Sequence, residues 1–139
     1  PFFYLPWTFP QYIDIPGTED KKNYTAYSDI LISKYKVRTI YLYSDIVTPD
    51  LETYIGTTGT VMLGTQTPAQ IPPGWAMTIQ PNVVKAIQLA WPQLLAGQGG
   101  LAVQSPLGLG DIDPNLLSPG KQRLVEQMLQ KLQSGFVTP

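Results

Sequence analysis

The chain has 139 residues, enough for one domain or for one lobe of a larger protein with a single hydrophobic core. It contains no cysteine and no histidine, which excludes disulfides, thiolate nucleophiles, Ser-His-Asp catalysis and metal sites built on those ligands. The net charge is −1 and the basic residues are scattered, so we expect no nucleic-acid partner.

Residues 1–22 form the first predicted unit, a proline- and aromatic-rich arm and crossover, and residues 23–139 form the second, an α/β lobe. The arm begins PFFYLPWTFP, and three prolines in ten residues exclude a helix and favour an extended segment. Two interpretations remain open for the arm. It packs on the core of its own domain, or its aromatic side chains cover a partner surface or line a ligand cleft.

The first part of the lobe predicts a helix, a strand and a second helix. Apolar residues at helical spacing indicate a helix over about residues 23–35. The run TIYLY at residues 39–43 is apolar on both faces, as in parallel strands covered by helices. A threonine, a proline and an aspartate at residues 48–50 form a helix start, and this helix runs to about residue 57.

The remainder of the lobe continues the alternation of strands and helices. Asn82 is the predicted cap of its first helix, and Pro92 is expected to kink that helix. Residues 106–115 are interpreted as a loop. The predicted elements are strands over residues 60–64, 75–79 and 101–103 and helices over residues 82–96 and 118–134. This order predicts an α/β fold, a three-layer sandwich with a mostly parallel sheet.

Tests for reaction chemistry find no arrangement typical of an enzyme. The sequence has neither a G-x-S-x-G elbow nor a phosphate-binding P-loop. Residues 97–100 (GQGG) follow a helix rather than a strand, so they are interpreted as a cap and turn instead of a dinucleotide fingerprint. Asp111 and Asp113 either hold a calcium ion or form a solvated turn. We therefore expect a protein that is not an enzyme and has no cofactor or metal.

A ligand site remains as the expected functional feature, because open α/β sheets bind ligands beyond the carboxyl ends of their strands. Ser44 and Asp45 follow the first predicted strand, and Thr65 and Gln66 follow the second. The Asp45 carboxylate can accept hydrogen bonds from hydroxyls or amines of a ligand, or it can cap the next helix or turn. Trp75 can stack on a ligand ring or serve as a packing residue of the core.

Five segments between residue 40 and the C-terminus follow one another in an order that resembles a family of solute receptors. They are IYLYSD, PDLETYIGTTG, TVMLG, WAMTIQPNVVKAIQLAWPQLLAGQGG and SPGKQRLVEQMLQKLQSGFVTP. In this succession of parts, over about 100 residues, the chain resembles the second half of the type I periplasmic binding proteins. It is most similar to the basic-membrane-lipoprotein group, which delivers nucleosides and related solutes to ABC importers.

The resemblance implies a periplasmic-binding-protein-like lobe that holds a small polar ligand, nucleoside-like or similar, for transport by an ABC transporter. It also implies an extracytoplasmic location, as a periplasmic or cell-surface lipoprotein. The family's receptors close two lobes on the ligand, whereas this chain resembles one, so a missing N-terminal lobe or partner chain is expected. The rival hypothesis is an interaction or assembly protein whose aromatic arm packs on a partner chain.

Overall fold

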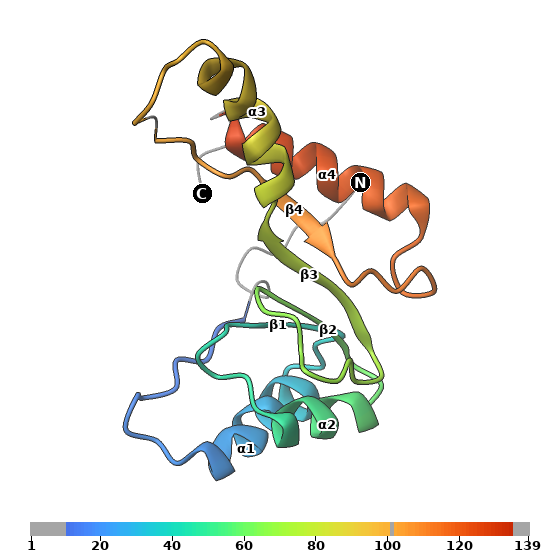
Figure 1. Ribbon diagram of the computed structural model, residues 1–139. Coiled ribbons are helices and arrows are strands. Elements are labelled where there is room, and N and C mark those ends of the chain that lie inside the picture. The colour runs from blue at the N-terminus through green and yellow to red at the C-terminus, as the bar shows by residue number, and fades with distance from the viewer. Residues whose placement is uncertain (1–10, 101, 135–139) are drawn as a thin grey trace.

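A four-stranded sheet with the strand order β1-β2-β3-β4 organises the fold (Figure 1). The structure is a computed structural model that describes residues 11–100 and 102–134. Three strands run parallel and the fourth runs antiparallel to its neighbour β3. The strands are β1 (Thr39–Leu42), β2 (Val61–Gly64), β3 (Trp75–Pro81) and β4 (Leu107–Gly110). The α/β class and the mostly parallel sheet predicted from the sequence are confirmed.

Helices precede and connect these strands at the positions that the sequence predicts. The 3-10 turn, α-helix and π turn at the start follow one another without a break and occupy the place of the helix predicted over residues 23–35. The other three predicted helices are confirmed to within two residues at each end. The elements are η2 (Lys21–Asn23), α1 (Tyr24–Asp29), η3 (Ile30–Lys34), α2 (Pro49–Thr57), α3 (Val83–Leu95) and α4 (Pro119–Gln133). Residues 1–10 of the predicted arm lie outside the described residues.

Side-chain caps explain why α2 and α3 begin where they do. The Thr48 hydroxyl accepts a hydrogen bond from the Leu51 backbone N–H at 3.2 Å, and proline occupies the first turn of α2. The Asn82 side chain accepts one from the Lys85 backbone N–H at 2.9 Å. Both caps satisfy a backbone donor that has no partner inside its helix.

The fourth strand was predicted at the wrong position in the chain. Ala102 and Val103 are not in a strand, and β4 instead lies within the segment predicted to be a loop. Pairing with β3 gives β4 its register, from Thr78↔Gly110 to Pro81↔Leu107. A Cβ on Gly110 would lie 2.5 Å from the amide nitrogen at the end of the Gln80 side chain, so a larger residue there would require that side chain to move.

Strand β3 belongs to two halves of the molecule. Its first part, up to Thr78, pairs with β2, whereas its last part, from Thr78 onward, pairs with β4. We call the elements from η2 to β2 the N-terminal half and those from α3 to α4 the C-terminal half. In Figure 1 the first lies below and the second above, with β3 running between them.

The main hydrophobic core lies in the N-terminal half and the start of β3. It consists of Tyr24, Ile40, Leu42, Leu51, Ile55, Met62 and Trp75. Helices α1 and α2 lie on the same side of β1 and β2, while α4 packs beside β4 and α3 follows the end of β3 (Figure 1). Among the described residues, no helix combines the length and the apolar character needed to cross a membrane.

Candidate functional site

The carboxyl ends of β1 and β2 meet at one edge of the sheet. The two strands are parallel and Leu42 pairs with Gly64, so the residues that follow each strand leave the sheet at the same level. These are the residues that the sequence singled out, Ser44 and Asp45 after β1 and Thr65 and Gln66 after β2, and all four are exposed. Their predicted position after the ends of the strands is therefore confirmed.

This edge faces the C-terminal half of the molecule. Gly64, the last residue of β2, pairs with Thr78 in the middle of β3. Beyond Thr78, β3 continues in the same direction into the C-terminal half, where it pairs with β4. The end of β2, with Thr65 and Gln66 after it, consequently lies near the junction between the two halves.

Asp45 does not cap the next helix, because Thr48 has that role. It lies in the turn of residues 44–46, where the Ile46 backbone N–H donates to the Tyr43 carbonyl oxygen at 3.2 Å. Within the part of the chain that the structure describes, the side chains of Ser44, Asp45 and Gln66 have no hydrogen-bond partner. Exposed polar groups of this kind can form a hydrogen bond with a ligand without first breaking one inside the protein.

Two tyrosines, Tyr41 in β1 and Tyr43 directly after it, precede Ser44 and Asp45 in the chain. The rings of Tyr41 and Tyr43 pack edge to face with their centroids 4.9 Å apart. Partial burial and the neighbouring Tyr43 raise the pKa of Tyr41, while a hydrogen bond with Thr65 acts in the opposite direction. The Tyr41 phenol therefore stays neutral at physiological pH and can both donate and accept hydrogen bonds. Tyr43 is 57% exposed, so its side chain is accessible to a ligand.

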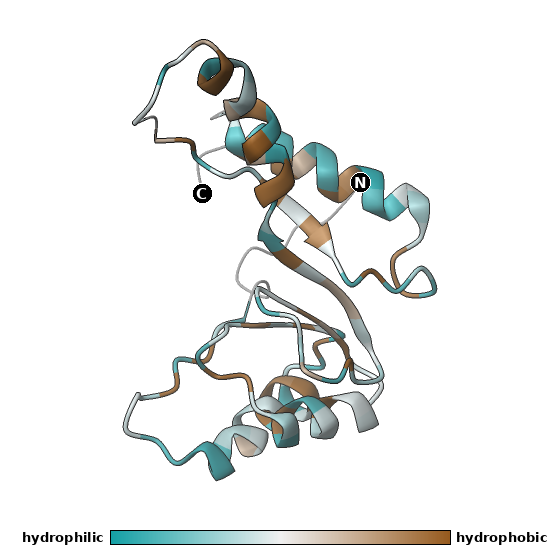
Figure 2. Cartoon of the chain, in the orientation of Figure 1, coloured by the Kyte–Doolittle hydropathy of each residue, from teal (hydrophilic) through white to brown (hydrophobic). Residues whose placement is uncertain are grey.

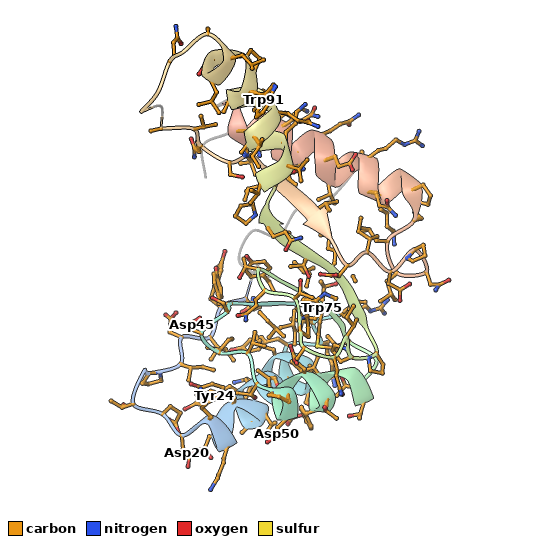
Figure 3. All side chains as sticks on the ribbon, in the orientation of Figure 1. Asp20, Tyr24, Asp45, Asp50, Trp75 and Trp91 are labelled. Carbon is orange, nitrogen blue, oxygen red and sulfur yellow. The ribbon has the colours of Figure 1, made fainter. Side chains whose placement is uncertain are left out.

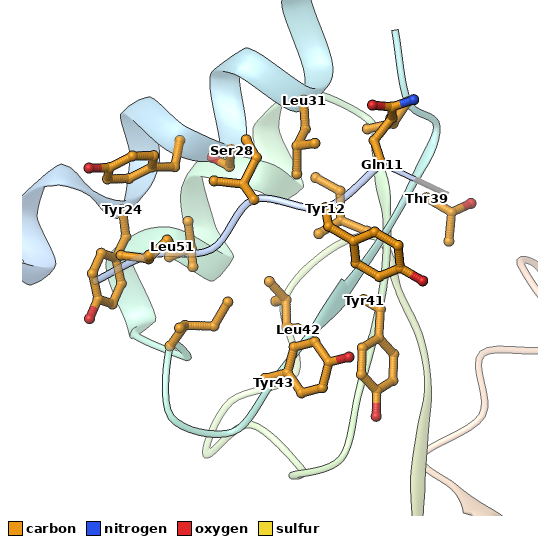
Figure 4. A pocket seen from close by; sticks show the side chains of 16 residues that line it. Gln11, Tyr12, Tyr24, Ser28, Leu31, Thr39, Tyr41, Leu42, Tyr43 and Leu51 are labelled. Carbon is orange, nitrogen blue, oxygen red and sulfur yellow. The ribbon is translucent and has the colours of Figure 1, made fainter. Parts of the chain in front are cut away.

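A cavity of about 380 Å³ continues from the tyrosine pair along β1. It lies between β1, α1 and the segment of residues 11–15. Figure 4 shows the rings of Tyr12, Tyr41 and Tyr43 gathered at one end of it. Most of the lining is apolar and aromatic, and its other tyrosines are Tyr24 and Tyr27. The sequence analysis left open that aromatic residues of the arm line a ligand cleft, and Tyr12 of the arm lines this cavity; it did not predict the part that β1 and α1 have in the lining.

Trp75 is not available to stack on a ligand, which was one of the two interpretations of this residue. Its side chain is 1% exposed and belongs to the core. Its indole N–H donates to the Thr78 hydroxyl at 3.2 Å. Figure 3 places Trp75 in the interior, well separated from Asp45. The open alternative, that Trp75 packs in the core, is the one the structure has.

Asp111 and Asp113 bond inside the chain. The Asp111 carboxylate accepts hydrogen bonds from the hydroxyls of Thr67, at 2.5 Å, and of buried Thr78, at 2.9 Å. Asp113 accepts two from Asn115 and forms a turn. Asp111 thus ties the loop after β2 to the junction of β3 and β4. The described residues contain no group of three acidic side chains that could hold a metal ion.

Comparison of the chain with protein-family models, with curated proteins and with solved structures finds no match. The site is therefore defined by its own geometry: two polar strand ends, an aromatic pair and an adjoining apolar cavity.

Proposed function

We propose that this chain is a solute-binding lobe of an ABC-importer receptor, and that it holds a small polar ligand without covalent chemistry. The resemblance of residues 40–139 to type I periplasmic binding proteins of the basic-membrane-lipoprotein group supports this function. The proposal includes the finer description of the fold, a periplasmic-binding-protein-like lobe with helices on both faces of its sheet. It also includes an extracytoplasmic location and a second lobe on the other side of the ligand.

One observation carries the proposal: the exposed Asp45 carboxylate, which has no hydrogen-bond partner among the described residues, follows the exposed Tyr43 by two residues at the carboxyl edge of a parallel sheet. A carboxylate accepts hydrogen bonds from two neighbouring hydroxyls, as on a ribose, and an aromatic ring stacks on a planar base. Ser44, Thr65 and Gln66 add donors and acceptors at the same edge. A nucleoside combines both kinds of group, which makes it the ligand class that the site fits best.

Calorimetric titration of the intact receptor with a panel of nucleosides, sugars and amides tests the proposal. A hydrogen bond to a charged group contributes about 1.5–3 kcal/mol, so Asp45→Asn should weaken binding by roughly 10- to 100-fold. Asp50→Asn, which changes an exposed carboxylate of α2, is the matched control and should leave the affinity unchanged. The proposal is wrong if no member of the panel binds, or if the two variants bind equally well.

A further inference from the structure

One side of helix α3 carries an apolar stripe that the rest of the described chain leaves exposed. With about 3.6 residues per turn, the polar residues Lys85, Gln88 and Gln93 lie together on the other side of the helix. The helix has no buried residue. Six large apolar residues, each 50% to 72% exposed, form what we call the α3 stripe: Val83, Val84, Ile87, Trp91, Leu94 and Leu95. Figure 2 shows the hydrophobic colour along α3.

The chain contacts α3 beside the stripe and not along it. Ala86 and Ala90 are the partly buried residues of α3, and they lie one turn apart on a line next to the stripe. Pro92 lies on the polar side, between Lys85 and Gln88 around the helix, so it does not interrupt the stripe. Figure 3 shows Trp91 on α3, far from Trp75 and the core. The α3 stripe is therefore free for a contact with another molecule.

The positions of the α3 stripe are symmetric about Leu89. Residues 84, 87, 91 and 94 follow one another at intervals of three, four and three, as the core positions of a coiled coil do. When two copies of α3 lie antiparallel with their Leu89 residues level, every residue of one stripe meets a residue of the other. The facing pairs are Val83 with Leu95, Val84 with Leu94, and Ile87 with Trp91. A two-fold contact requires a surface that matches itself in this way.

The charges of α3 permit the same arrangement. Lys85 is the only charged residue of the helix and lies outside the stripe. In the antiparallel pair each Lys85 is level with Gln93 of the other copy, and the two lysines are about 12 Å apart along the helix axes. That separation exceeds the screening length of about 8 Å at physiological salt, so the lysines repel each other little. The opposed helix dipoles also attract each other.

The area of the α3 stripe indicates a weak contact. A fully exposed large aliphatic side chain presents about 60–120 Å², so six residues at half to three-quarters exposure present roughly 200–500 Å² in each copy. Two copies together therefore bury roughly 400–1,000 Å² of apolar surface. Interfaces below about 1,200 Å² are typical of transient complexes. We expect a dimer with a Kd of roughly 10–100 μM.

We infer that the chain forms a two-fold dimer through α3, in which two copies of the helix pack antiparallel along the α3 stripe. The second copy is the partner that fits, because an identical helix in the opposite direction supplies an apolar residue opposite each residue of the stripe and brings no charge to it. The inference goes beyond the proposed function and does not depend on it, since the α3 stripe contains none of the residues of the ligand edge.

Sedimentation equilibrium of the full chain over a range of concentrations tests the inference. Ile87→Glu should weaken the dimer by about 100-fold or more, because it places a carboxylate against Trp91 at two positions in each dimer. Ile71→Glu is the matched control, since Ile71 is 57% exposed against 53% for Ile87 and lies outside α3. It should leave the Kd unchanged. Circular dichroism shows whether both variants keep their helices. A chain that remains monomeric well above 100 μM, or a folded Ile87→Glu variant that dimerises like the parent, would overturn the inference.

Cysteine cross-linking tests the antiparallel arrangement without disturbing the charge of the stripe. The chain has no cysteine of its own, so single cysteines report on one position each. A mixture of the Val84→Cys and Leu94→Cys variants, treated with a short bismaleimide, should give dimers that contain one chain of each kind. Val84→Cys alone should give few, because its two cysteines would be about 15 Å apart along the helix axes. A mixture without cross-links, or Val84→Cys alone linking as well as the mixture, would contradict the two-fold antiparallel contact.

Discussion

Glu52 is the buried carboxylate of the N-terminal half. It is 6% exposed in the first turns of α2, and its Oε1 has no hydrogen-bond partner within the described chain. Burial raises its pKa above the ordinary value of 4.5. The folded state therefore holds this proton more tightly than the unfolded state, so stability falls as the pH rises from 4.5 through the folded pKa. Stability at neutral pH is therefore lower than at pH 4 by the cost of ionising this buried carboxyl.

Glu52→Gln should consequently raise the free energy of unfolding at pH 7 by about 1 kcal/mol, because it removes the buried charge at nearly constant shape. The difference should disappear below about pH 4, where both states carry the proton. Urea unfolding at pH 4 and pH 7 measures both values. Glu126→Gln, on the exposed surface of α4, should stay within about 0.5 kcal/mol of the parent chain at both pH values. A Glu52→Gln variant that is less stable at pH 7 would refute this account.

The sequence predicted where the individual site residues lie, because their location follows from their position in the chain after a strand. Ser44, Asp45, Thr65 and Gln66 lie at strand ends because the runs before them are strands, and strand ends in a parallel sheet share an edge. Their part in binding remains a prediction. The burial of Trp75 and the bond from Thr67 to Asp111 were not predictable, because they depend on contacts across the sheet.

At the scale of elements, the turn into β3 depends on one glycine. Gly74 has φ +86°, and its carbonyl oxygen accepts a hydrogen bond from the Met62 N–H at 2.7 Å. A Cβ at this position would lie 2.8 Å from the Thr60 carbonyl oxygen. Both the left-handed backbone and the close approach favour glycine. The start of β3 is thereby held against β2.

Gly74→Ala should lower the free energy of unfolding by roughly 2–4 kcal/mol, since it combines backbone strain with a steric clash. Gly59→Ala separates the two causes, because Gly59 has φ +73° but nothing within 4 Å of an added Cβ. This second variant should lose only about 1 kcal/mol. Thermal and urea unfolding of both variants give the comparison. Equal losses would show that the contact with Thr60 has no effect on stability.

The predicted elements were correct where hydrogen bonds between residues close in sequence define their ends. They were wrong where an element depends on pairing with a strand distant in sequence. Thr48 and Asn82 cap their helices by bonds within three residues, so the sequence alone indicates these starts. Strand β4 contains Gly108 and Gly110, which resemble turn residues in sequence. The side chains of Gln80 and Asn82 lie against these glycines, a contact that depends on the pairing with β3 and is not visible in the sequence.

At the scale of the whole molecule, the sequence predicted one lobe, and the structure has two unequal halves joined by β3. The run WAMTIQP forms one strand, and nothing in it indicates that its neighbours change at Thr78. The spacing of apolar residues in α3 is that of a helix with one apolar side, yet Val84, Ile87 and Trp91 are exposed. Amphipathic spacing indicates that a helix face is to be covered, but it does not indicate what covers it.

The unequal halves should unfold unequally, and amide hydrogen exchange of this chain measures the difference. The amides of β1 and β2 lie against the core of Ile40, Leu42 and Met62, so they should exchange only through opening of the N-terminal half, at roughly 5 kcal/mol or more. The amides of α3 lack buried side chains around them and should exchange through local opening below about 2 kcal/mol. Equal protection in both halves would show that β3 couples them into one cooperative unit.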